Sequence, residues 1–147
     1  MTADDPRQSA IAQSELAKAE MVAVTLPALC ELVWVLSRGY QTPEPAIAEA
    51  IRRLINAANV EMNRPAVEAG LDMLVSGGDF ADGVIAYEGN WLGGEAFVSF
   101  DRQAVRLLTA RGQGARLPRQ SPFPAALARP SPARQNQRND KRIPPHV

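Results

Sequence analysis

The sequence predicts one α/β domain of the three-layer α/β/α type, in which helices cover both faces of a short central parallel sheet. Short apolar runs of strand length alternate along the chain with segments of helical periodicity. Helical connections between strands favour parallel pairing, since parallel strands need a crossover. A length of 147 residues with 46% hydrophobic content is enough for one core.

The first elements follow from their boundary residues. An Asp-Pro pair starts a helix over 5–19, because aspartate is a good N-cap and proline fits the first helical position. The apolar run MVAVTL predicts a strand over 21–26. A second helix is expected over 27–39, where Gly39 stands at the position of a C-terminal cap.

The later elements continue this alternation. A helix from Thr42-Pro43 places Ile47, Ile51 and Ile55 on one face. The remaining expected elements are a strand over 60–62, a helix over 64–77, a helix beginning near Asp79, a strand over 96–100, a helix over 101–111 with Val105 and Leu108 inward, and an edge strand over 115–117.

Residue counts exclude several kinds of chemistry. Cys30 is the only cysteine and His146 the only histidine, so an internal disulfide, a Cys/His zinc site and a histidine-based triad are all excluded. The groups that remain available for chemistry are carboxylates, hydroxyls, arginines and backbone groups. Clustered carboxylates without histidine favour a hard cation such as Mg²⁺ or Mn²⁺.

The chain has no sign of a membrane or secretory segment. No run approaches the roughly 18 consecutive apolar residues of a membrane span. The first residues, MTADDPRQ, lack the basic-then-apolar pattern of a secretory signal. We therefore expect a cytoplasmic protein without a membrane partner.

Charge divides the chain into a body and a tail. Residues 1–117 carry 10 Lys and Arg against 15 Asp and Glu, whereas residues 118–147 carry 6 against 1. The tail also holds seven of the twelve prolines and has no periodic apolar face, which predicts disorder. A basic tail can attract RNA phosphates, but a solvated tail without a role, or an extension of the reading frame, is the favoured interpretation.

Three aspartates between residues 77 and 101 are the main candidates for chemistry. Asp79 and Asp82 stand three apart at the start of a helical segment, so they can lie on neighbouring ridges of one turn. Asp101 follows the apolar strand AFVSF. Because ligand sites in open parallel sheets lie beyond the carboxyl ends of strands, these acids are expected to meet there. Asp79 is explained equally well as a helix cap, whereas Asp82 has no capping role.

A fourth acid, Glu31, lies near the start of the second helix among apolar residues, and we expect it to be buried. It could complement the positive end of the helix dipole. A metal site at the same sheet edge explains more and is the favoured interpretation. Trp34 and Trp91 are interpreted as core or interface anchors, Ser99 as a strand filler more than a supporting hydroxyl, and Cys30 as a small core residue.

Three motifs in order carry a resemblance to a known family. They read LPALCELVWVL, GGDFADGVIA and FVSFD, with an apolar-Asn-Val-Glu strand between the first two. They resemble the PIN-domain nucleases, and within these the VapC toxins of bacterial toxin–antitoxin pairs, over residues 1–117. By this resemblance Glu31, Asp82 and Asp101 match the family's catalytic, metal-binding acids. Asp79 matches an additional metal-binding acid of this branch.

The resemblance implies a parallel-sheet domain that binds Mg²⁺ or Mn²⁺ and cuts RNA. The implied partners are RNA and a cognate antitoxin protein, with a homodimer left open. The family begins with a central strand that ends in Asp-Thr-Asn. In the family, the segment that corresponds to MTADDPRQSAIA follows this strand directly, so the motif has no counterpart within residues 1–117. The strands over 21–26 and 96–100 would then each lack a neighbour. We expect a misassigned start or a truncated, inactive remnant.

Two other functions remain open. A noncatalytic module could keep the fold and bind an antitoxin or a second copy of itself. A phosphate-handling domain of the receiver type would also gather carboxylates at a sheet edge, but it needs a lysine near them. Lys18 is the only lysine of the body, so this type is the least favoured.

Overall fold

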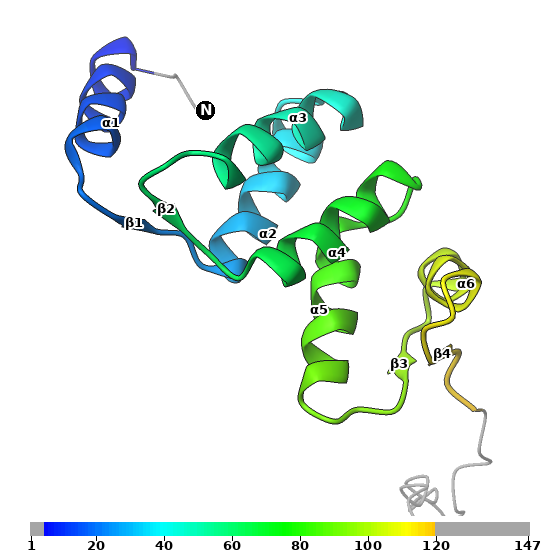
Figure 1. Ribbon diagram of the computed structural model, residues 1–147. Helices are drawn as coiled ribbons and strands as arrows, with labels where there is room; N and C mark the ends of the chain where they lie inside the picture. The colour runs from blue at the N-terminus through cyan, green and yellow to red at the C-terminus, as the bar shows by residue number, and fades with distance from the viewer. Residues whose placement is uncertain (1–4, 120–147) are drawn as a thin grey trace, which may run out of the picture.

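The computed structural model describes residues 5–119, and Figure 1 shows their arrangement. The expected disordered tail therefore lies outside the described residues, apart from its first two positions. The helices of the described part are α1 (Pro6–Lys18), α2 (Leu26–Trp34), α3 (Glu44–Ile55), α4 (Arg64–Val75), α5 (Phe80–Trp91) and α6 (Arg102–Ala110), with a π-helical turn η1 (Val35–Gly39) after α2. The strands are β1 (Val22–Ala23), β2 (Val60–Glu61), β3 (Phe97–Val98) and β4 (Ala115–Arg116). This order confirms a mixed, helix-rich α/β class.

The strands form two separate parallel pairs instead of one central sheet. β1 pairs with β2, with Val22 opposite Val60, and β3 pairs with β4, with Phe97 opposite Ala115. In Figure 1 the first pair lies to the left of α4 and α5 and the second to their right. Within the described residues, β1 and β3 each have one neighbour. The sheet is divided because no described strand joins these two edges.

Helices α2 to α5 build most of the hydrophobic core. The amphipathic pattern of α3 is borne out, since Ile47, Ile51 and Ile55 are buried on one face. The other large buried members of this cluster include Leu29, Val33, Val67, Leu71, Leu74, Phe80 and Val84. The core therefore lies between helices, with little contribution from the two-residue strands.

Two glycines allow α4 and α5 to pack closely. A Cβ atom at Gly83 would lie 2.4 Å from the carbonyl oxygen of Ala69, and one at Gly70 would lie 2.7 Å from the ring of Phe80. Neither glycine therefore has room for a side chain. This contact fixes the first turn of α5, which carries the candidate aspartates.

Helix α6 is attached to the C-terminal end of α4 by two long side chains. Arg111 donates to the carbonyl oxygen of Asp72 and, at 2.6 Å, to Oγ of Ser76. Gln103 donates to the carbonyl oxygen of Gly77. These bonds satisfy carbonyl and hydroxyl groups at the end of α4. The Gln103 bond holds the start of α6 near the start of α5, and the Arg111 bonds hold its end against α4.

Two local expectations are corrected. Trp34 and Trp91 are 62% and 77% exposed, which excludes the core interpretation, while their interpretation as interface anchors stays a prediction. Gly39 does not supply the left-handed residue after the second helix; Gln41 has a φ of 52° instead. The π-helical turn moves the end of the helix by widening its last turn, which shifts the backbone reversal beyond Gly39.

None of the described helices has the length and apolar character needed to cross a membrane.

Candidate acidic site at the start of helix α5

The first candidate acid, Asp79, is the N-cap of α5. Its Oδ1 accepts a hydrogen bond of 2.8 Å from the backbone N–H of Ala81. The next residue, Phe80, is 1% exposed and anchors the helix in the core. The capping interpretation of Asp79 is therefore confirmed. A cap can still be a ligand, because a carboxylate has a second oxygen.

Asp82 lies one turn into α5 and is half-buried. Its removal from solvent raises the pKa of its carboxyl group, and the nearby charges of Asp79 and Asp101 raise this pKa further. Both causes disfavour the ionised form. Asp79 and Asp101, which come from two separate segments, therefore both lie close enough to Asp82 to raise the pKa of its carboxyl group.

Asp101 reaches this cluster from the end of β3. Its Oδ1 caps α6 by accepting bonds of 2.7 Å and 3.1 Å from the N–H groups of Gln103 and Ala104. The N–H of Asp101 donates to Oγ of Ser99 at 3.1 Å. Ser99 thus helps to orient the acid, so the favoured interpretation of this serine as a filler is wrong.

The carboxylate oxygen atoms that the capping bonds do not use are of the kind that binds a hard cation. Both capping bonds use Oδ1, and among the described residues no hydrogen bond reaches Oδ2 of Asp79 or Asp101. Carboxylate oxygens are the ligands that Mg²⁺ and Mn²⁺ prefer. However, no group of three or more Asp, Glu, His or Cys in residues 5–119 is already arranged to hold a metal ion. The donor chemistry fits, and the metal site stays a prediction.

Glu31 is exposed, which corrects the expectation that it is buried. Helix α2 buries Leu26, Leu29 and Val33. This i, i+3, i+7 stripe leaves Glu31 on another face. Glu31 is therefore exposed in the fold although its neighbours in the sequence are apolar.

Cys30 is the residue of α2 whose pKa is affected by the acids at α5. This thiol is half-buried, and burial raises its pKa; the charges of Asp79 and Glu88 raise it further. Sequence reasoning missed Glu88, because no motif or periodic pattern distinguishes it from other exposed acids. Its proximity to Cys30 depends on how α2 packs against α5.

Comparison of the chain with protein-family models, with curated proteins and with solved structures gives no match. The case for a function therefore depends on the described residues and on the resemblance of their motifs.

Proposed function

We propose that this chain is a PIN-like domain of the VapC type, an endoribonuclease that uses Mg²⁺ or Mn²⁺ and is paired with an antitoxin. The observation that supports this proposal best is the influence of Asp79 and Asp101 on Asp82. These acids come from the start of α5 and the end of β3, and the pKa of Asp82 rises first because the group is partly buried and further because Asp79 and Asp101 are also acidic. Such a cluster favours either a bound proton or a bound cation.

Each acid has a role in the proposed site. Asp82 and Asp101 are the central ligands, Asp79 offers its free oxygen as an additional one, and Glu31 joins them from α2. Glu31 is exposed and is not among the charges that raise the pKa of Asp82, so its place in the site is proposed from the resemblance of its motif alone. When bound, a divalent cation supplies Lewis acidity toward a phosphodiester.

Electrostatics also explains why the nuclease needs a cation before RNA binds. The described part of the site presents aspartates to solvent, and RNA phosphates carry the same sign of charge. Without a counterion the two repel, most strongly at low ionic strength. RNA binding should therefore depend on added metal most strongly at low salt, whereas cleavage should need the metal at every salt concentration because the metal also supplies the Lewis acidity.

The 147 residues of this sequence supply only part of the proposed set of metal-binding acids. The family's first aspartate, from its Asp-Thr-Asn strand, has no counterpart among the matched motifs. Loss of positioning alone can lower a rate by about a hundredfold. We expect the 147-residue chain to cleave RNA weakly or not at all with Mg²⁺ or Mn²⁺. A version extended by an upstream strand ending in aspartate should cleave it.

A cleavage assay of both proteins tests this proposal. Asp82→Asn in the extended protein removes one charge with almost no change in shape and should abolish cleavage. Asp72→Asn, an exposed aspartate on α4, is the matched control and should leave cleavage unchanged. Strong cleavage by the 147-residue chain, lost on chelation and in Asp101→Asn, would show that the additional strand is dispensable.

Two observations favour a second candidate function, a noncatalytic module that binds an antitoxin or self-associates. The described residues contain no ready group of three metal-ligating side chains, and Glu31 is exposed. Calorimetric titration with Mn²⁺ separates the two functions. Heat of binding that disappears in Asp82→Asn supports the nuclease, whereas no binding in either protein supports the noncatalytic module.

A further inference from the structure

The C-terminal part of the described chain has a charge opposite to the part before it. Residues 1–101 carry 6 Lys and Arg against 15 Asp and Glu, whereas residues 102–119 carry 5 arginines and no acid. Helix α6 and strand β4 lie within this basic segment. The basic segment therefore begins one residue after Asp101, an acid of the candidate site.

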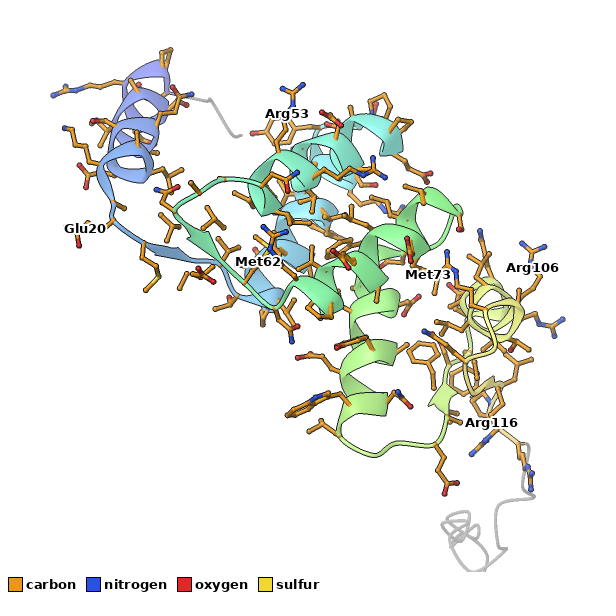
Figure 2. All side chains as sticks on the ribbon, viewed as in Figure 1. Glu20, Arg53, Met62, Met73, Arg106 and Arg116 are labelled. Carbon is orange, nitrogen blue, oxygen red and sulfur yellow. The ribbon has the colours of Figure 1, made fainter. Side chains whose placement is uncertain are left out.

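Two of these arginines lie on the outer face of α6. The helix buries Ala104 and Leu108. The helical repeat places Arg102 and Arg106 on the opposite side, and both are exposed. Figure 2 shows Arg106 pointing outward from the helix. We call Arg102 and Arg106 the arginine pair of α6.

The arginine pair has no partner for its charge among residues 5–119. The one ion pair within this range joins Arg53 to Glu49 on α3, and no described residue forms a hydrogen bond with either side chain of the arginine pair. Arg111 of the same segment, by contrast, bonds to the end of α4. The arginine pair is therefore available to bind an anion from outside the molecule.

The arginine pair begins at the candidate site and follows the helix away from it. Asp101 is the N-cap of α6, and Arg102 is the first residue of the helix. Arg106 lies one turn further, about 6 Å along the helix axis. The carboxylate of Asp101 already accepts the N–H groups of Gln103 and Ala104. An anion on this face is therefore held by the guanidinium groups and not by the helix end.

We propose that the arginine pair of α6 binds the phosphate backbone of a single-stranded RNA segment that extends from the candidate acidic site. A guanidinium group can bind two oxygen atoms of one phosphate. Cβ atoms one helical turn apart are roughly 5 to 6 Å from each other, so the two long side chains can reach successive phosphates of one strand. Contacts of this kind position the strand and do not read its bases.

Charge complementarity selects a polyanion for this face, and the adjoining site selects RNA among polyanions. The choice of RNA rests on the proposed nuclease function, whereas the exposure of the arginine pair does not. The acids of the site repel phosphates, and two positive charges next to them offset this repulsion. The orientation of α6 follows from described contacts, because Gln103 and Arg111 hold the helix to the C-terminal end of α4.

Fluorescence anisotropy of a short labelled oligouridine, titrated with the full 147-residue chain, tests the proposed contact. The titration is made at several salt concentrations with Mg²⁺ and, to prevent metal-dependent cleavage, with EDTA. Arg102→Gln combined with Arg106→Gln should make the slope of log affinity against log salt shallower by about 1.4, because each lost contact with a single strand removes roughly 0.7. Arg102→Lys combined with Arg106→Lys keeps both charges and should keep most of the slope.

Arg52→Gln combined with Arg53→Gln is the matched control, since it removes the same charge from α3. Figure 2 shows Arg53 on α3, away from α6. The control should leave the slope nearly unchanged. Equal losses in the two glutamine double variants would show that net charge alone attracts RNA. Unchanged binding in both would place the RNA on another part of the chain, and either result would overturn the proposed contact.

Cleavage separates the proposed contact from the proposed nuclease function. In the protein extended by an upstream strand, the Arg102→Gln and Arg106→Gln double variant should raise the KM for RNA and leave kcat nearly unchanged, because contacts away from the reacting phosphate bind ground and transition states alike. If the extended protein does not cleave RNA while the 147-residue chain binds it through the arginine pair, the nuclease fails and the contact stands.

The opposite result is equally distinct. Cleavage by the extended protein with an unchanged KM in the glutamine double variant would leave the nuclease and overturn the contact. Absence of RNA binding by the unaltered chain, both with Mg²⁺ and with EDTA, would also overturn it. Binding of labelled polyglutamate in place of oligouridine would assign the arginine pair to an acidic protein segment, which likewise contradicts the proposed RNA contact.

Discussion

Asp82 differs from its two neighbours in having no helix-capping bond to balance its charge. Asp79 and Asp101 each accept backbone N–H bonds, whereas Asp82 lies inside the helix. Burial and the two neighbouring charges raise its pKa. A carboxyl group with a raised pKa in the folded state stabilises the fold when protonated. That contribution is complete below its ordinary pKa of about 3.9 and is lost as pH rises through the raised value.

The first prediction is that Asp82→Asn increases thermal stability at pH 7. The amide removes the ionised form that burial and repulsion disfavour. The gain should stay below about 1 kcal/mol, because the group is partly solvated and solvent screens the repulsion. Melting temperature measured between pH 7 and pH 3 should show the gain shrinking toward low pH.

Asp72→Asn is the control for this experiment, since Asp72 is exposed on α4. It should change the melting temperature little at either pH. If Asp82→Asn lowers stability at pH 7 while the control does not, the charge of Asp82 is compensated by a partner, and the repulsion described above is wrong.

At the scale of elements, the contact between α4 and α5 decides where the site lies. Gly83 faces the backbone of α4, with the Cα of Gly70 only 2.9 Å from where its Cβ would stand. Gly89 is in the same helix but has nothing within 4 Å of its Cβ position. The two glycines therefore give a matched test of close packing.

The second prediction is that Gly83→Ala destabilises the fold, whereas Gly89→Ala does not. Forcing α4 and α5 apart should cost about 1 to 3 kcal/mol. Gly89→Ala should instead stabilise by roughly 0.5 to 1 kcal/mol, because alanine loses less backbone entropy in a helix. Urea unfolding followed by circular dichroism measures both changes. Equal effects of the two substitutions would contradict the close packing.

The third prediction concerns the attachment of α6. Arg111 bonds to a carbonyl and a hydroxyl group at the end of α4, and Figure 2 shows Arg106, by contrast, pointing outward from α6. Arg111→Leu should lower the free energy of unfolding by about 1 kcal/mol, the usual net value of a hydrogen bond. Arg106→Leu, measured by the same urea unfolding, should have no comparable effect. Similar losses in both would mean that α6 is not held by these bonds.

At the scale of the whole molecule, charge and composition separate residues 118–147 from the rest. This segment is basic and rich in proline and has no apolar face, so it has little surface to bury. The fourth prediction is that removing it changes the melting temperature by less than about 2 °C, a shift that corresponds to well under 1 kcal/mol. A larger loss would show that the segment packs against the body.

The sequence by itself determined the order of the elements, many of their starts and the apolar face of α3. These depend on short-range physics: Asp5 and Asp79 cap helices through N–H groups two residues away, and Ile47, Ile51 and Ile55 repeat with the helical period. The rule that ligand sites lie beyond the carboxyl ends of strands anticipated that Asp82 and Asp101 lie near each other, since Asp82 is in the first turn of α5 and Asp101 follows β3.

The sequence also anticipated that the strands over 21–26 and 96–100 each lack a neighbour, and in the described residues β1 and β3 each pair on one side only. Only the tertiary structure decided the exposure of Glu31 and the place of Cys30 beside Asp79 and Glu88. Helix α2 is apolar on most sides, so its sequence alone did not identify the buried face. The packing of α2 against α5 selected that face and, with it, the side chains that surround the candidate site.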